Sequence, residues 1–530
     1  MDSAIHNFWN ILFKRDIVKK DELLREAIRV KKTQHLIEKQ KMDFSQEDTE
    51  SLFEFMKENT EDKYLGYFPG DREFFAALYS IGKELQIIDF VIETYKNDYS
   101  GTIIAPIYLT DYLKRYIERE DSNSILINEA EKFLMGLELL INSSSKQRYT
   151  LTTSNYLMYE MLKIALIKEK HIKVVHSSLY LPLELEDRFD VIISIPAFGG
   201  KINDVKSFIT NDTSGIATEN QLKLLKEDGD LVEIVPASFT FSSGSISNVR
   251  RLVTEKFYLK SIYSLPEGTF RPYTGIKTYI LTIKNSLNKE QIEVGKLTFK
   301  DKLLKVEDSK TIRADILEKY EDWRIELILA EDKSEIKKYN ESTVPKVKLN
   351  EIAEVFRGKS IMKNDLKPGD IFILNISNIE DGQILHETME TINEEERKVK
   401  RYELIENDLV ITCRGTVNKV AVFKEINKTV IASANVIVIR FKEKVASEYV
   451  KIFLESPVGT ELVKTFQRGT TVMNINPKDI SEMEIPMVDY HRQLEFVRKY
   501  QEELELYQES VKRATERWNS QKHTIYNCLV

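Results

Sequence analysis

The sequence has 530 residues, of which 42% are hydrophobic and 31% are charged, and its formal net charge is −8. That length allows roughly two to four domains of a soluble globular protein, and the negative balance excludes uniform coating of nucleic acid but not a local basic face. No apolar stretch is long enough for a membrane span, and no signal-peptide pattern opens the chain. The two distant cysteines and the seven histidines form no disulfide or metal-binding pattern. We therefore expect a cytoplasmic protein without membrane contact.

Two regions of different periodicity make up the first half of the chain. Residues 1–95 carry apolar side chains at helical spacing, which predicts a helical N-terminal domain. Residues 96–285 alternate short β-rich runs with helical segments, which predicts an α/β domain with a mostly parallel sheet and helices on both faces. The expected strands are Ser124–Ile127, Lys173–His176, Asp190–Ser194, Asp230–Val235, Leu259–Tyr263 and Thr278–Ile283, and the expected helices include Tyr156–Ile167 and Glu219–Glu227.

The remaining residues divide into three parts. Residues 286–344 are charged and mixed, and we expect a bridging region. Residues 345–490 contain short β-rich runs separated by turn signals, which predicts an α+β domain. Residues 491–530 form one long helix in which Val497, Tyr500, Leu504, Tyr507, Val511, Ala514 and Trp518 recur at alternating gaps of three and four, a heptad rhythm typical of coiled coils.

A short motif directly follows the expected strand Asp190–Ser194. Its residues are Ile195, Pro196, Ala197 and Phe198. The motif resembles the catalytic loop of amino-methyltransferases, Asn-Pro-Pro-aromatic, in which the Asn side chain and the first Pro carbonyl accept hydrogen bonds from the amine of a flipped base. Ile195 has no side-chain acceptor, so the motif is degenerate. Two interpretations of Phe198 stay open, because its ring could stack on a base or pack beneath the loop.

The segments after this motif carry a more specific family signal. Asp228–Pro236, Ser264–Phe270 and Thr274–Thr278 agree in order, spacing and residue kind with the second half of the N6-adenine DNA methyltransferases of type I restriction-modification systems. The resemblance implies a Rossmann-like methyltransferase domain that binds S-adenosylmethionine and methylates adenine in DNA.

The positions that such a family uses for its cofactor are degenerate as well. Ala105 stands where the family has Thr, and the segment from Ile127 to Glu131 lacks the expected Asp and glycines. Thr152 and Ser177 lie near the places of two acidic residues that would contact the adenosine. We therefore expect a pseudo-methyltransferase without cofactor or catalysis. The alternative is a divergent active enzyme that uses S-adenosylmethionine.

The C-terminal part resembles a target-recognition domain from the specificity subunit of a type I system. Val347–Ser360, Asn407–Thr412, Arg414–Thr416 and Ala432–Asn435 carry this likeness. The resemblance implies binding to double-stranded DNA, in which loop side chains read base edges and other groups contact phosphates. The candidate DNA-contacting residues are Lys359, Arg414, Thr416, Lys419, Asn435, Arg468 and Thr471. For any one of them, a solvated surface residue or local turn former is the competing interpretation.

The resemblance also bears on partners. Full specificity subunits carry two recognition domains whose helices pair antiparallel, whereas this chain has one domain and one helix. We therefore expect a homodimer or hetero-complex through Val497, Tyr500, Leu504, Tyr507, Val511 and Trp518, unless the helix docks on its own domain.

These features together predict a DNA-recognition component of a bacterial restriction-modification or phage-defence system. It would position an active methyltransferase or nuclease subunit. An active methyltransferase with built-in specificity and a scaffold without DNA binding are the alternatives.

Overall fold

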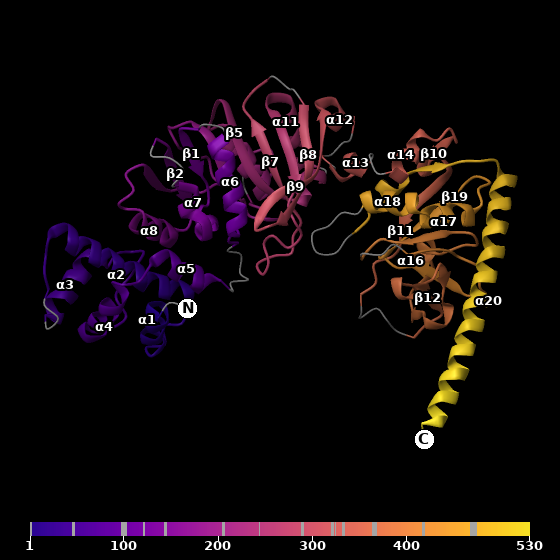
Figure 1. Ribbon diagram of the computed structural model, residues 1–530, viewed down its shortest axis with the longest axis horizontal. Coiled ribbons are helices and arrows are strands. Elements are labelled where there is room, and N and C mark those ends of the chain that lie inside the picture. Colours follow the sequence, from indigo (N-terminus) through magenta and orange to yellow (C-terminus); the bar gives the residue numbers. More distant parts are fainter. Residues whose placement is uncertain are drawn as a thin grey trace. The chain divides into compact units, whose positions relative to one another are not determined.

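The computed structural model describes residues 3–44, 48–96, 103–119, 122–141, 146–203, 207–242, 244–287, 291–319, 323, 325–330, 334–362, 368–415, 419–466 and 474–529. The chain forms two compact units, Met1–Ile325 and Glu326–Val530, and each is considered by itself (Figure 1).

The first unit begins with five helices. They are α1 (Ser3–Phe13), α2 (Lys20–Gln40), α3 (Thr49–Thr60), α4 (Arg72–Gly82) and α5 (Ile87–Tyr95). Asp48 and Asp71 cap α3 and α4 by accepting hydrogen bonds from the backbone N–H groups of Ser51 and Phe74. The fully buried guanidinium of Arg29 donates to Thr60, to the carbonyls of Leu65 and Gly66, and to Glu26. The helical N-terminal region predicted from the sequence is confirmed.

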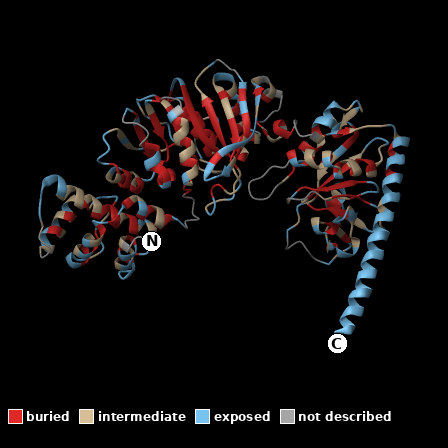
Figure 2. Cartoon of the chain, viewed as in Figure 1, coloured by how far each residue is buried: buried red, intermediate tan, exposed pale blue. Residues whose placement is uncertain are grey.

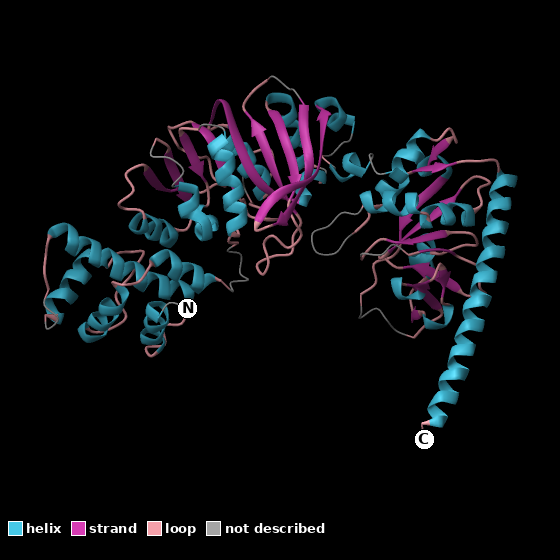
Figure 3. Ribbon diagram, in the orientation of Figure 1, coloured by secondary structure: helices cyan, strands magenta, loops and turns pink. Residues whose placement is uncertain are grey.

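A nine-stranded sheet forms the centre of this unit (Figure 3). Its strands are β1 (Ser124–Ile127), β2 (Arg148–Thr153), β3 (Ile172–His176), β4 (Phe189–Ser194), β5 (Leu225–Pro236), β6 (Tyr258–Ser264), β7 (Thr278–Lys284), β8 (Gln291–Lys300) and β9 (Leu303–Arg313). Their spatial order is β3-β2-β1-β4-β5-β7-β6-β8-β9. The first five strands in this spatial order, β3, β2, β1, β4 and β5, are mutually parallel. Strand β7 lies between β5 and β6 and is antiparallel to both. The predicted α/β class with a mostly parallel sheet is confirmed.

Helices accompany this sheet along the chain. They are α6 (Ile107–Arg119), the 3-10 helix η1 (Ala130–Gly136), α7 (Leu137–Ile141), α8 (Tyr156–Ala165), α9 (Thr213–Leu222), α10 (Ala237–Phe241), α11 (Ser245–Lys256) and α12 (Ala314–Lys319). The next helix, α13 (Ile325–Ala330), begins at the last residue of this unit, and its other residues belong to the second unit. The helix expected at Glu219–Glu227 is wrong in its bounds, because α9 ends at Leu222 and β5 already begins at Leu225. Residues 286–344, for which the sequence predicts only a bridge, contribute β8 and β9 to the sheet.

The strand order places a switch point in this sheet. From β1 the chain continues to β2 and β3 on one side and then returns to β4 on the other side. In open α/β sheets, ligands bind beyond the carboxyl ends of the strands at such a reversal. The segments that follow Ile127 and Ser194 are therefore the place to look for a site.

The second unit combines small sheets with short helices. Its strands are β10 (Lys346–Lys348), β11 (Ala353–Arg357), β12 (Ile371–Leu374), β13 (Ile379–Glu380), β14 (Gln383–Ile384), β15 (Glu390–Ile392), β16 (Leu409–Thr412), β17 (Val420–Val422), β18 (Thr429–Ala432), β19 (Val436–Phe441) and β20 (Glu484–Pro486). Sheets β11-β19-β16-β17 and β15-β12-β18 supply the two main layers. The helices are α14 (Ser334–Glu341), α15 (Leu349–Ile352), η3 (Ile376–Asn378), η4 (His386–Thr388), α16 (Glu396–Val399), η5 (Lys400–Tyr402), α17 (Ser447–Glu455), α18 (Pro457–Thr465) and α19 (Pro477–Ser481).

A long helix ends the chain. α20 runs from Tyr490 to Cys528 and is capped by the Asp489 side chain. Within α20 only Gln493 and Val497 are buried, and the rest of the helix is exposed or half-buried (Figure 2). Docking on its own domain therefore covers only the first turns of α20. Over the described residues, none of the helices combines the length and the apolar character that crossing a membrane requires.

Candidate functional site

The segment after β1 keeps the backbone shape of a glycine loop without a glycine. Glu129 follows this strand with a φ of 51°, in the left-handed region that favours glycine. Immediately afterwards η1 begins at Ala130. The loop thus directs the carboxylate of Glu129 and the ammonium of Lys132, one turn later, toward each other.

The buried side chains of Glu129 and Lys132 and the half-buried side chain of Tyr180 form a network that joins the loops after β1 and β4. Lys132 Nζ lies 2.7 Å from Glu129 Oε2 and donates to the main-chain carbonyl of Ile195 at 2.6 Å. Tyr180 Oη donates to Glu129 Oε1 at 3.0 Å and accepts the backbone N–H of Ala197 at 2.7 Å. We call these three side chains the Glu129–Lys132–Tyr180 network. Burial, followed by the nearby Glu129 charge, raises the pKa of Tyr180, so it stays a neutral donor.

The degenerate motif after β4 is held by these contacts. The side chain of Ile195 is fully buried, and its carbonyl accepts from Lys132. The carbonyl of Ala197 accepts from Thr213 Oγ1 at 2.7 Å. The half-buried ring of Phe198 packs edge to face on Phe270, with centroids 5.5 Å apart, against the core of this unit. Pro196 is buried, and the Phe198 ring stays partly accessible, so stacking on a base and packing beneath the loop both stay predictions.

A second buried network starts at Asn128, the residue before Glu129. Thr152 Oγ1 donates to Asn128 Oδ1 at 2.6 Å, and Asn128 Nδ2 donates to Gln221 Oε1 at 2.8 Å. Gln221 Nε2 and Thr218 Oγ1 then donate to the two oxygens of Glu233 at 2.9 and 2.6 Å. Burial raises the pKa of Glu233 to about 8, against the opposing effect of these hydrogen bonds.

The predicted cofactor positions are mostly enclosed. The side chains of Ala105, Ile127, Glu131 and Thr152 are buried, and Ser177 is half-buried. Burial, followed by the Glu129 charge, raises the pKa of Glu131 to about 7. The sequence had not identified Lys132, Tyr180, Gln221 or Glu233. The only sequence signal for Lys132 was its place beside apolar residues shortly after a buried strand.

Three of the predicted DNA-contacting residues of the second unit lie at one edge. Lys359 forms a parallel bridge with Ser433, and Arg414 forms an antiparallel bridge with Asn474. The backbone of Cys413 donates to Asn435 O at 2.8 Å, and that of Ala434 donates to Lys359 O at 2.8 Å. These bonds bring Lys359, Arg414 and Asn435, which are far apart in sequence, to a common edge. We call it the reading edge, after the role that the sequence predicts for these residues.

The other DNA candidates differ in their surroundings. Lys419 Nζ donates to the carbonyl of Ile379 at 2.7 Å, and Lys359 Nζ lies 3.5 Å from Glu394. Thr416, Arg468 and Thr471 lie outside the described residues. Arg414 is exposed. Arg357, which the sequence had not singled out, donates to Asn474 Oδ1 at 2.9 Å and so supports the same edge.

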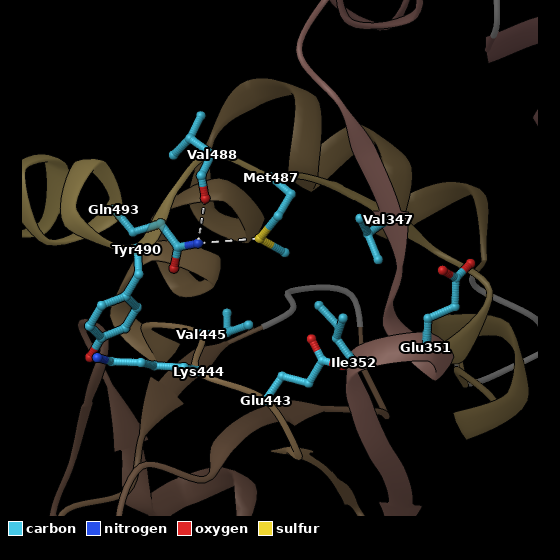
Figure 4. Close-up of a pocket in the computed structure, with 10 residues that line it drawn as sticks. All are labelled: Val347, Glu351, Ile352, Glu443, Lys444, Val445, Met487, Val488, Tyr490 and Gln493. Carbon is cyan, nitrogen blue, oxygen red and sulfur yellow. Dashed lines mark hydrogen bonds between the residues drawn. The ribbon is translucent and has the colours of Figure 1, made fainter.

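A cavity of about 430 Å³ lies at the start of α20. It is lined by Val347, Glu351, Ile352, Glu443, Lys444, Val445, Met487, Val488, Tyr490 and Gln493 (Figure 4). Gln493 Nε2 donates to Val488 O and Met487 Sδ. Glu443 follows the end of β19, whereas Asn435 precedes its beginning, so the cavity and the reading edge lie at opposite ends of that strand.

Across the described ranges, no cluster of three or more His, Cys, Asp or Glu side chains is suited to a metal ion.

Two families match this chain. Residues 122–355 match the N-6 DNA Methylase family, and residues 341–504 match the Type I restriction modification DNA specificity domain. A curated relative, the Type I restriction enzyme EcoEI methylase subunit of Escherichia coli, is 31% identical over 141 residues, which are 25% of this chain and 27% of that subunit. The match thus spans about a quarter of that relative's length.

Solved structures are similar at lower identity. The type IIG restriction endonuclease BpuSI is 13% identical with a TM-score of 0.47, and the alignment covers 94% of this chain and 75% of that chain. The type I restriction-modification methyltransferase subunit from Streptococcus thermophilus is 12% identical with a TM-score of 0.44, over 61% of this chain and 98% of that chain.

Proposed function

Because this chain joins an N-6 DNA methylase domain to a type I restriction-modification DNA specificity domain, we propose that it recognises DNA without transferring a methyl group itself. It acts in the bacterial cytoplasm as the recognition component of a restriction-modification or phage-defence system. A separate methyltransferase or nuclease subunit supplies the chemistry. The proposal separates finding the target, which the second unit performs, from modifying it.

The observation that carries the non-catalytic part is the missing acceptor in the motif after β4. A methyltransferase of this kind needs a side-chain acceptor at position 195 and the carbonyl of the following proline, here Pro196, to hold the amine of a flipped base. Ile195 supplies no side-chain acceptor, and its side chain is fully buried. The main-chain carbonyl of Ile195 accepts from Lys132 at 2.6 Å, and this bond holds the loop in place.

The residues after β1 do not fit S-adenosylmethionine. In such domains the cofactor lies close to the backbone of this loop, and glycines permit this approach because they have no side chain. In this chain the corresponding space contains the side chains of Glu129 and Lys132, both more than nine-tenths buried. We derive no step through the cofactor for this reason.

Calorimetry with S-adenosylmethionine tests this proposal. We expect no heat of binding by the wild-type chain, and none by Ile195→Asn, because restoring the acceptor leaves the cofactor space filled. A catalytically intact relative with the Asn-Pro-Pro-Phe motif serves as the positive control. Tight binding by the wild type, or adenine methylation by this chain alone, would contradict the non-catalytic assignment.

The helix α20 is the proposed means of assembly. Its seam residues Tyr500, Tyr507, Val511 and Trp518 are exposed large hydrophobic side chains. We propose that a second copy of this chain covers them and so supplies the second recognition domain. Burying such side chains contributes about 1.5–3 kcal/mol each and works against the loss of translational and rotational freedom on association.

A further inference from the structure

A compact basic cluster lies outside the reading edge that the sequence identified. Arg397 and Lys398 are on α16, and Lys400 and Arg401 are on η5. All four side chains are exposed. Lys400 and Arg401 form no ion pair with any residue in the described part of the chain, although Arg401 lies over the ring of Tyr402. We call these four residues the α16–η5 cluster.

The backbone places the α16–η5 cluster at one end of β18. Glu403 forms an antiparallel bridge with Ile431, and Leu404 N donates to Val430 O at 2.8 Å. Because the pairing is antiparallel, residues before Glu403 lie toward the carboxyl end of β18. That end is where Lys359 bridges Ser433. The cluster therefore adjoins the reading edge.

A carboxylate links the cluster to that edge. Glu394 Oε2 lies 3.5 Å from Lys359 Nζ, and Glu394 Oε1 lies 3.4 Å from Lys398 Nζ. The hydrogen bond from Lys398 holds the pKa of Glu394 below its usual range, so the group is an anion at neutral pH. The Glu394 carboxylate thus lies between two ammonium groups, and further cations lie nearby. A phosphate oxygen is also an anion and could bind in the same position.

We propose that the α16–η5 cluster binds the phosphate backbone of the DNA duplex next to the bases read by Arg414 and Asn435. This inference rests on the proposed DNA recognition and adds the surface that supplies its sequence-independent part. In the bound state, phosphate oxygens take the place of the Glu394 carboxylate at Lys359 and Lys398. The cluster positions the domain on the duplex but reads no sequence.

The test compares two double variants of the full chain. Lys400→Ala/Arg401→Ala removes two cluster charges, and Lys442→Ala/Lys444→Ala removes two exposed charges beyond the far end of β19, about 20 Å from Asn435. Binding to a random-sequence duplex, and to the sequence that the wild type enriches from a random library, is measured over a salt series. Circular dichroism checks that each variant is folded.

We expect the cluster variant to lower the slope of log affinity against log salt by about 2, because each phosphate contact contributes about 0.9. Affinity should fall by similar factors for both duplexes. The control variant should change the slope by less than about 1. Equal slopes for the two variants, or a loss confined to the enriched sequence, would overturn the inference.

A variant that is expected to strengthen DNA binding gives an independent check. Glu394→Gln removes the anion that competes with phosphate, so affinity at low salt should rise, and unchanged or weaker binding would count against the cluster. The proposed function fails differently: a wild-type chain that binds no duplex even at low salt would refute DNA recognition itself. A wild type that binds, with a cluster variant that keeps its full salt slope, refutes only the further inference.

Discussion

At the scale of single residues, the most informative position is Lys132. Its ammonium is buried and shares its hydrogen bonds between the Glu129 carboxylate and the Ile195 carbonyl. In water such a charge would be solvated, so its burial is stable only while both acceptors are in place. The same side chain thus holds the loop after β4 and, in the function we propose, fills the space that a cofactor would need.

We expect Lys132→Met to destabilise the first unit by about 3–5 kcal/mol, because it leaves the buried Glu129 carboxylate unpaired. The double variant Glu129→Leu/Lys132→Met should recover much of that loss. Thermal unfolding of the full chain measures both effects. Lys57→Met is the matched control, because Lys57 and its partner Glu54 are 39% and 55% exposed, so its loss should cost about 0–1 kcal/mol. Equal losses for Lys132→Met and Lys57→Met would show that the network is not a buried ion pair.

Glu233 gives a prediction about pH. Its pKa in the folded chain is about 8, raised from 4.5 chiefly by burial. The folded state therefore binds this proton more tightly than the unfolded state, and its contribution to stability is complete below about pH 4.5 and is lost as pH rises toward 8. Glu131, whose pKa is raised to about 7, acts with the same sign over a narrower range.

Glu233→Gln should flatten this dependence. The amide can still accept from Gln221 but cannot ionise, so the variant should gain stability relative to the wild type as the pH rises. The gain is at most about 1.4 kcal/mol per pH unit, as a single titrating group allows. Melting temperatures between about pH 5 and pH 9 measure it. Parallel curves for the two proteins would mean that Glu233 is not protonated in the folded chain near neutral pH.

At the scale of elements, apolar runs revealed the strands that are buried on both faces. The runs Ser124–Ile127 and Asp190–Ser194 were predicted as strands and correspond to β1 and β4. The strand β2 was missed, because Arg148–Thr153 is rich in threonine and reads as polar although five of its residues are buried. Thr152 is buried only because Asn128 accepts its hydroxyl, a contact between neighbouring strands that sequence spacing does not reveal.

The same limit applies to the candidate site. Degeneracy at Ile195 was visible from the sequence, since an acceptor side chain is absent there. The partner of its carbonyl was not visible, because Lys132 reaches it only through the parallel pairing of β1 and β4. In the second unit, motif order predicted DNA contacts at Lys359, Arg414 and Asn435, and the bonds of the structure bring these three residues together. The α16–η5 cluster carries no motif, and its place beside them follows only from the bridge between Glu403 and Ile431.

At the scale of the whole molecule, the charge of α20 distinguishes two ways of pairing. Residues 490–509 carry five acidic and three basic side chains, whereas residues 510–528 carry one acidic and four basic side chains. A parallel pair would place like charges together, and an antiparallel pair would place the acidic half of one helix against the basic half of the other. Antiparallel pairing centred on Glu509 also sets Tyr500 opposite Trp518 and Tyr507 opposite Val511.

We therefore expect the full chain to be an antiparallel dimer. Tyr507→Glu/Val511→Glu should convert it to a monomer in light scattering, since each lost apolar contact costs about 1.5–3 kcal/mol and each new charge adds a desolvation penalty. The control Thr515→Ala/Asn519→Ala changes exposed, uncharged residues outside the heptad seam and should remain dimeric. A wild-type chain that is monomeric at high concentration would contradict pairing of α20.

Cysteine crosslinking then determines the direction of pairing. In an antiparallel pair the two copies of the exposed Cys528 lie at opposite ends of the helices, so mild oxidation of the wild type should give no covalent dimer. Gln508→Cys, placed in a Cys528→Ser background, lies beside the centre of the pair and should crosslink efficiently. The parallel arrangement predicts the reverse for Cys528, because both copies would then end side by side. Rapid disulfide formation through Cys528 would show that the helices pair in parallel, with like-charged halves side by side. The two recognition domains would then lie at the same end of the helix pair.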